Sequence, residues 1–291
     1  MRKPKFAETP LGLGNKVIRQ QSSFSRRSLL LTAGFLGTRF PLKAETRQEK
    51  ATRLVRESLE ALGGDAFLQI RNTVQTGRAY SFYREQLRGL AVMTIYERFE
   101  PPREDVGPDW LPVSRREVYS EKGDYYVLFV NGKGWEITFR GARPYDPERM
   151  VRYRESTRRN FFYFLRYRLN EPGLYFYHKG VEILNNVPTD AIDISDQQGE
   201  TITVYLAQSD RLPVEQVYTR RDPKTRIPYE EKSVFSKYRP VGSVKLPWNI
   251  RHERDGEKIL ELFGATLLVN ETLEESLFSL SKDLPVLPEA P

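Results

Sequence analysis

Residues 199–263 constrain the fold more than any other stretch of the chain. Five short segments rich in Val, Ile, Tyr, Phe and Thr follow one another there, and a turn signal closes each of them. β-Branched and aromatic residues favour strands, whereas Gly, Pro, Asn and Asp favour the turns between strands. The turns fall at 208–210, 221–223, 240–242 and 255–256. No helix fits between these breaks, so the stretch is predicted to be an antiparallel meander.

Strand patterns also fill most of the chain between residues 73 and 195. Segment 125–130 is apolar at nearly every position, which predicts that both of its faces are buried. Together with the meander, these patterns indicate a mainly β (α+β) chain of about eleven or twelve strands, with one domain over residues 45–291. The predicted strands before the meander are 73–85, 90–99, 115–120, 125–130, 135–140, 174–184 and 189–195.

Two amphipathic helices accompany the strands. Residues 46–62 place their apolar side chains on one stripe, and a glycine pair at 63–64 ends the pattern. Residues 146–169 begin with Asp146 as the N-cap and Pro147 at the first helical position, and they contain seven arginines. Three interpretations of this second helix stay open. It completes the core, it forms the lid of an acyl-chain cavity, or it rests on an anionic membrane surface.

The distribution of charge argues against nucleic acid as a partner. The net charge is +7, but residues 1–44 hold nine Lys or Arg and one Glu, which leaves 37 basic and 38 acidic residues in the rest of the chain. A nucleic-acid-binding body would need a basic excess of its own. The chain has no Cys and only two His, so no disulfide or Cys-based metal site is available. No cofactor motif and no catalytic motif is present, and we predict neither a cofactor nor an enzyme.

The N-terminal residues 1–44 have the parts of an export signal. A Ser-Arg-Arg sequence at 25–27 precedes a short apolar run at 29–36, and the small residue Ala44 follows. The stretch resembles a twin-arginine signal, although leucines replace the usual Phe and Lys, so the export pathway stays open. An ordinary N-terminal helix is the alternative. We expect a cleaved leader and a soluble periplasmic protein that starts near Glu45.

The few candidates for chemistry are weak. Asp190, Asp193 and Asp196 could chelate Ca²⁺ or serve a hydrolase, but acidic residues at solvated strand ends are the simpler interpretation. His178 lies in an aromatic strand and could face a cavity, whereas His252 is expected at the surface. Without a nucleophile or a second histidine nearby, these residues predict no catalytic site and no metal site.

The meander resembles periplasmic outer-membrane lipoprotein-sorting proteins of the LolA/LolB-like group. The resemblance implies a curved, unclosed antiparallel β-barrel of about eleven strands, covered by helices, whose cavity binds lipid or acyl chains. The carriers of that group present an arginine inside the cavity that holds the lid, and the sequence assigns this role to no particular arginine. The matching residues are Leu212-Pro213-Val214, Tyr218, Ser236, Tyr238, Arg239, Val241-Gly242, Val244-Lys245-Leu246-Pro247, Val269-Asn270 and Leu277-Phe278.

These observations predict a periplasmic carrier that binds a lipid or lipoprotein acyl chain without covalent chemistry. Phe161, Phe164 and Leu165 are the predicted lid residues, and Trp248 and Ile250 are the predicted cavity wall, because alternate positions share one strand face. An envelope sensor that binds a protein partner on the same fold is the alternative, and a hydrolase is a third. Transient contact with a membrane surface is a further expectation.

Overall fold

Thirteen β-strands form one antiparallel sheet in the computed structural model, which describes residues 44–103 and 105–289. The first meander comprises β1 (Asn72–Tyr83), β2 (Gln86–Phe99), β3 (Val113–Val118), β4 (Tyr126–Val130), β5 (Lys133–Thr138) and β6 (Gly141–Pro144). The second comprises β7 (Tyr175–Leu184), β8 (Val187–Ser195), β9 (Thr201–Ala207), β10 (Pro213–Arg221), β11 (Pro228–Val241), β12 (Val244–Arg254) and β13 (Glu257–Val269).

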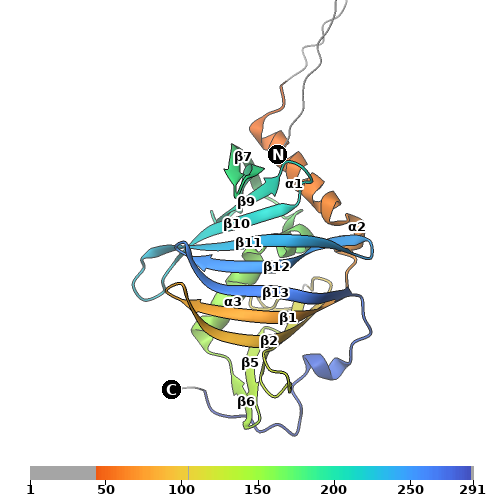
Figure 1. Cartoon of the computed structure of the whole chain (residues 1–291), viewed down its shortest axis with the longest axis vertical. Coiled ribbons are helices and arrows are strands. Elements are labelled where there is room, and N and C mark those ends of the chain that lie inside the picture. The colour runs from red at the N-terminus through yellow and green to blue at the C-terminus, as the bar shows by residue number, and fades with distance from the viewer. Residues whose placement is uncertain (1–43, 104, 290–291) are drawn as a thin grey trace, which may run out of the picture. The chain divides into compact units, whose positions relative to one another are not determined.

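The two meanders join through their first and last strands. β1 pairs with β13 from Thr73 opposite Val269 to Ser81 opposite Leu260, so the strand order runs β6 to β1 and then β13 to β7. The sheet is curved and unclosed, because β6 and β7 stand at its two edges in the described part of the chain (Figure 1). The predicted mainly β fold is therefore confirmed, with thirteen strands instead of about eleven. The strand that the sequence patterns missed is the four-residue β6.

The chain between β6 and β7 has to cross the whole sheet, because these consecutive strands lie at opposite edges. The crossing carries α3 (Pro147–Arg159), α4 (Phe161–Tyr163) and the π-helix η1 (Phe164–Arg168). Figure 1 shows α3 crossing behind the central strands. The single helix expected over 146–169 was wrong. Asn160 adopts an extended conformation with φ −65° and ψ 129° and breaks the helix between α3 and α4.

The N-terminal helix α1 (Arg47–Leu62) confirms the helix expected at 46–62. Thr46 and Glu49 form a capping box at its start, and Gly63 closes its end with a φ of 124°. The short helix α2 (Asp65–Leu68) follows at once. The buried face of α1 consists of Ala51, Leu54, Val55, Ser58, Leu59 and Leu62.

Both faces of β4 are buried, as its apolar sequence predicts. Val127 and Phe129 pack with Met150 of α3 on one face. Leu128 packs with Ile137 and with the C-terminal segment on the other. This segment includes the 3₁₀ helix η2 (Glu275–Phe278). The C-terminal segment therefore serves as a cover for the outer side of the first meander.

The expected leader and its cleavage point near residue 44 lie outside the described residues, apart from Ala44 itself. Residues Ala44–Pro291 cluster as one compact unit. Within the described part of the chain, no helix has the length and apolar character needed to cross a bilayer.

Candidate functional site

The helices cover one face of the sheet, which we call the inner face. The largest hydrophobic cluster of the described residues lies on this face and joins α1, α4 and η1 to strands β7 to β13. The sheet contributes alternate residues, such as Ile202, Val204 and Leu206 of β9, as the sequence pattern predicts. We call this region the apolar half of the inner face. Its buried helical residues are Ala51, Leu54, Val55, Leu59, Leu62, Phe67, Phe161, Phe164 and Leu165.

The five residues predicted from the sequence to line a lipid site lie on this face, but not all in one cluster. Phe161, Phe164 and Leu165 are 0%, 2% and 2% exposed and belong to the apolar half. Trp248 packs against the same cluster while it remains partly exposed. Ile250 is two residues further along β12, half-buried, and outside the cluster. Their role in binding a ligand remains a prediction.

Gln216 holds the three lid residues in place. Its side chain on β10 is 2% exposed, and its Oε1 accepts a hydrogen bond of 2.8 Å from the backbone N–H of Phe161. The amide nitrogen of Gln216 donates to the carbonyl of Arg159 at 3.4 Å. The Asn160 side chain accepts from the N–H groups of Phe162 and Tyr163. These backbone N–H and carbonyl groups at the helix break therefore have hydrogen-bond partners. The break also turns Phe161 toward the sheet.

Arg166 of η1 connects the two covering segments, and sequence reasoning assigned it no role. Its guanidinium donates to the carbonyls of Leu68 at 2.6 Å and Ile70 at 3.0 Å, and also to that of Phe67. These carbonyls stand at the end of α2, where a cation is favoured by the helix dipole. Burial lowers the pKa of Arg166. Among the described residues, no carboxylate forms a salt bridge with this arginine.

The guanidinium of Arg166 also lies over the Phe99 ring, 4.3 Å from its centroid. Backbone oxygens and aromatic faces are therefore its direct contacts, and the charge of Glu97 acts on it from a longer distance. These contacts of Arg166 can break without leaving a carboxylate unpaired. No local sequence signal distinguishes Arg166 from the other arginines of the 146–169 segment.

An ionic cluster around Asp190 fixes α1 to the sheet. The carboxylate of Asp190 lies 2.8 Å from His178 Nε2, 2.9 Å from Arg211 Nη1 and 3.4 Å from Lys50 Nζ of α1. Burial alone would raise the pKa of Asp190. The hydrogen bond from His178 and the charge of Lys50 outweigh burial, so the net effect is a lowered pKa. The expectation of a solvated strand end is wrong for Asp190, whose side chain is 3% exposed.

The other expected acids also have structural partners. Asp193 accepts a hydrogen bond from Thr203 at 2.6 Å, and Asp196 lies 3.0 Å from Arg168. No group of three His, Cys, Asp or Glu in the described ranges could hold a metal ion. These acids therefore act as links between strands and loops.

The remaining part of the inner face, under α3, is rich in charge. Glu97 and Arg115 are 2.6 Å apart across β2 and β3, and Tyr119 donates to Glu117 at 2.8 Å. His252 of β12 lies 3.0 Å from the Ser233 hydroxyl. We call this region the charged half. It comprises Glu97, Arg115, Glu117, Tyr119, Tyr153, Arg220, Glu231, Ser233 and His252.

The expectation that His252 lies at the surface is wrong. Burial and the nearby positive charge of Arg115 lower the pKa of His252 to about 4, so its imidazole is neutral at physiological pH. β12 explains this position, because Leu246, Trp248, Ile250 and His252 occupy alternate places and share one face. The same strand therefore runs from the apolar half into the charged half.

Two contacts attach α3 to the charged half. The ring of Tyr153 stacks on Phe129 of β4 with centroids 3.6 Å apart and an interplanar angle of 7°. Arg220 of β10 donates to Ser156 at 3.2 Å, lies 3.4 Å from Glu231 and pairs with Glu155 of α3. The cover over this half therefore adds ion pairs to the packing of Tyr153 and Met150, whereas the cover over the other half is aliphatic and aromatic.

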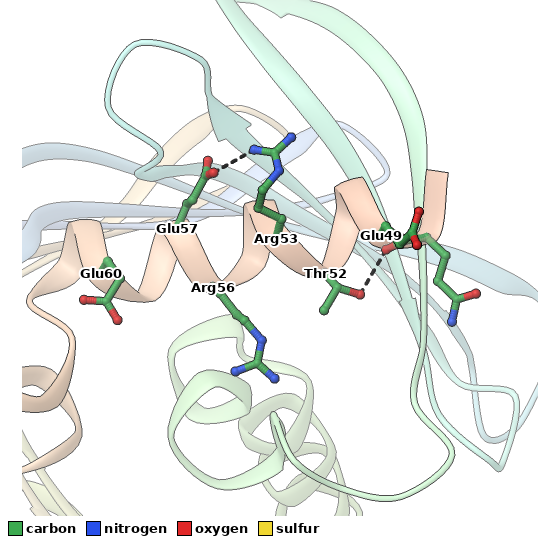
Figure 2. A pocket seen from close by; sticks show the side chains of 7 residues that line it. Glu49, Thr52, Arg53, Arg56, Glu57 and Glu60 are labelled. Carbon is green, nitrogen blue, oxygen red and sulfur yellow. Dashed lines mark hydrogen bonds and ion pairs between the residues drawn. The ribbon is translucent and has the colours of Figure 1, made fainter. Parts of the chain in front are cut away.

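The solvent face of α1 borders a hollow of about 650 Å³, and its described lining comes from α1 alone. Figure 2 shows Arg53 directed toward Glu57, with which it forms an ion pair of 2.6 Å, while Arg56 and Glu60 project from other turns of the helix. The described lining comes from a single helix and leaves the hollow open, whereas an acyl chain needs a site that encloses it. The inner face of the sheet is therefore the better candidate for a lipid site.

The fold has counterparts among solved structures. No protein-family model matches the chain, and no curated protein matches it. A DUF1329 family protein from Desulfovibrio piger superposes with a TM-score of 0.52 at 12% identity, over 80% of this chain and 98% of that one. A putative outer membrane lipoprotein-sorting protein domain from Vibrio parahaemolyticus superposes with a TM-score of 0.50 at 12% identity, over 79% and 97%.

These two structures identify the class of fold. The chain has the curved, helix-covered sheet of the outer-membrane lipoprotein-sorting type, so the resemblance seen in the sequence is confirmed at the level of the fold. A LolA superfamily protein from Nitrosomonas europaea also matches, at 9% identity over 79% of this chain and 97% of that one, with a TM-score of 0.47. At such identities the likeness concerns architecture, and the function has to be argued from the site.

Proposed function

We propose that this protein is an exported, periplasmic carrier that holds the acyl chain of a lipid or lipoprotein against the apolar half of the inner face. One observation carries the proposal. A wide apolar strand face is covered by two separate helical segments, and Arg166 ties these segments together through backbone carbonyls. The fold class, in which one neighbour is a putative lipoprotein-sorting domain, supports the same conclusion.

An acyl chain would enter by replacing helix side chains on the sheet. In the closed arrangement Phe161 and Phe164 fill the apolar half, so α1–α2 or α4–η1 has to move before a ligand can bind. Each methylene group taken out of water contributes about 0.8 kcal/mol. The side chains that leave the face lose a comparable contribution, so net affinity depends on how easily the cover opens. Arg166 is placed to set this equilibrium.

Trp248 marks the expected end of the acyl site. It is partly exposed, packs against the apolar half, and its indole N–H is buried without a hydrogen-bond partner. An unpaired buried donor costs about 1–3 kcal/mol. A ligand carbonyl or ester oxygen beside this N–H would remove that cost. We therefore place the polar end of the acyl chain near Trp248, with Ile250 beyond it.

The proposal is tested by extraction of the purified exported protein with organic solvent, followed by mass spectrometry. We expect bound lipid in an amount comparable to the protein, and an intact mass that corresponds to a start near Glu45. Protein that carries no lipid and also fails to bind a fluorescent fatty acid would contradict the carrier function. A retained leader would contradict only the export step.

A second function, sensing through a protein partner, is favoured by the outer face of the sheet. Leu90 and Val92 of β2 are 57% and 40% exposed, and Phe263 of β13 is 39% exposed. The strand register places Arg78 opposite both Val92 and Phe263, so these side chains are neighbours on one face. Exposed apolar groups that lie together mark interaction surfaces. A stoichiometric protein partner recovered from envelope extract, without lipid, would favour this function over the first.

A further inference from the structure

A second hollow, of about 740 Å³, lies on the side of α4–η1 that faces away from the apolar half. Tyr163 and Tyr167 line it, whereas their neighbours Phe161, Phe164 and Leu165 are buried against the sheet. Its other walls come from the end of α3, from the loop between β2 and β3, and from the turns around residues 171–172 and 196–200. The volume is typical of a small-ligand site.

Hydrogen bonds and ion pairs hold the walls of this hollow in place. The Tyr167 hydroxyl donates to the carbonyls of Glu100 at 3.1 Å and Pro112 at 3.0 Å, which fixes the loop to η1. Arg168 lies 3.0 Å from Asp196 and donates to the carbonyl of Arg158 at 3.2 Å. Contacts within the chain therefore hold the hollow in shape, so binding there would require little ordering of the chain.

The lining combines aromatic rings with polar groups whose charges cancel. The ring centroids of Tyr163 and Tyr167 lie 4.9 Å apart with the rings tilted by 48°, and Trp110 of the loop is the third aromatic residue of the described lining. Burial raises the pKa of Tyr163 to about 12, so its phenol is a neutral hydrogen-bonding group. The described lining also holds two Gln, four Arg and four acidic residues, which are Arg103, Arg158, Arg159, Arg168, Glu155, Glu171, Asp196 and Glu200.

This composition does not suit an acyl chain or a polyanion. An acyl chain would remove ten charged or amide side chains from solvent without offering any of them a hydrogen bond. A polyanion would need free cations, but Arg168 is paired with Glu171 at 2.9 Å and with Asp196, and Arg159 is paired with Glu200. A neutral ligand with many hydroxyl groups avoids both problems. Its hydroxyls can donate to the carboxylates and accept from the guanidinium groups, and it needs no unpaired cation.

We propose that this hollow binds a short neutral glycan, whose sugar rings stack on Tyr163 and Trp110 and whose hydroxyls bond to the surrounding carboxylates and guanidinium groups. The flat C–H faces of a sugar ring match an aromatic surface, and adjacent hydroxyl pairs match a planar carboxylate or guanidinium. The glycan site is separate from the acyl site, since α4–η1 presents opposite sides to the two. The inference therefore stands whether or not the chain carries a lipid.

The test is a titration of the purified full-length chain with the neutral tetrasaccharides chitotetraose, cellotetraose and maltotetraose, followed by calorimetry. We expect at least one of them to bind with a dissociation constant in the millimolar range or tighter. Trp110→Ala and Tyr163→Ala should each weaken that binding about tenfold or more, since each removes a stacking surface. Tyr163→Phe keeps the ring and should retain most of the affinity.

The matched control is Tyr83→Ala, which removes an aromatic side chain that is 57% exposed on another part of the sheet and should leave glycan binding unchanged. Circular dichroism of each variant separates loss of the site from loss of the fold. The proposal is wrong if none of the three tetrasaccharides binds, or if binding survives both alanine substitutions in folded protein. Binding of a proline-rich peptide or of heparin at this hollow, with no tetrasaccharide bound, would also overturn it.

Discussion

The apolar half and the charged half of the inner face share one strand, β12, but different forces stabilise them. In the apolar half, Trp248 packs among aliphatic and aromatic side chains from two helical covers. In the charged half, four residues further along, His252 lies among Arg115, Glu117 and Glu231 under α3. Burial of apolar area does not depend on pH, whereas a set of paired ionisable groups does. We therefore propose ligand binding for the first half and predict that the second half is sensitive to acid.

The largest expected effect is on the apolar half. Phe164→Ala removes a ring that is 2% exposed and should lower the free energy of unfolding by about 3–5 kcal/mol, because it loses transfer energy and leaves a cavity. Phe139→Ala is the matched control, since that ring is 83% exposed. Urea denaturation of both variants measures the difference. Equal effects would show that the apolar half is not the main core.

A smaller effect is expected from the charged half on acidification. His252 has a pKa of about 4 in the folded protein, below the value of about 6.5 in the unfolded chain. The unfolded chain therefore binds more protons between these pH values. His252 contributes its full stability above pH 6.5 and loses it as the pH falls through 4, by about 3 kcal/mol in total.

Urea unfolding at a series of pH values measures this loss. His252→Gln should flatten the pH dependence over this range, since it removes the titrating group. An unchanged slope in the variant would show that the loss of stability arises elsewhere, and the distinction between the two halves would then lose its electrostatic basis.

The smallest of the expected effects on stability concerns the helix break at Asn160, between α3 and α4. Gln216→Ala leaves the buried N–H of Phe161 without an acceptor and should cost about 1–3 kcal/mol. Gln198→Ala, at an exposed turn, is the matched control. Amide hydrogen exchange should rise in residues 160–165 of the first variant only. If exchange stays slow in these residues, the conformation of the helix break does not depend on Gln216.

The sequence predicted the strands and the apolar half well because alternation and turn residues are local signals. Ile202, Val204 and Leu206 share a face by spacing alone, and all three are buried in one cluster. The charged half was not predicted, because its members come from strands that are far apart in sequence. His252 and Arg115 are an example, and nothing in the residues around His252 indicates that Arg115 is nearby.

The helix break at Asn160 was missed for a related reason. The 3.6-residue period continues through it, and the acceptor that stabilises the break is Gln216, 55 residues away in sequence. Likewise, Arg166 differs from the other arginines of its segment only through the carbonyls at the end of α2. Long-range polar partners of this kind leave no local pattern in the sequence.

The central claim is that the cover over the apolar half opens to admit an acyl chain and that Arg166 holds it closed. The most direct test is titration of the full-length chain with a fluorescently labelled palmitic acid, in Arg166→Gln and in Arg56→Gln, which changes an exposed arginine on the solvent face of α1 (Figure 2). We predict that Arg166→Gln raises the apparent affinity about tenfold, since more of the protein is open, while Arg56→Gln matches the unchanged chain. Equal affinities in all three proteins, or no binding in any of them, would contradict the account.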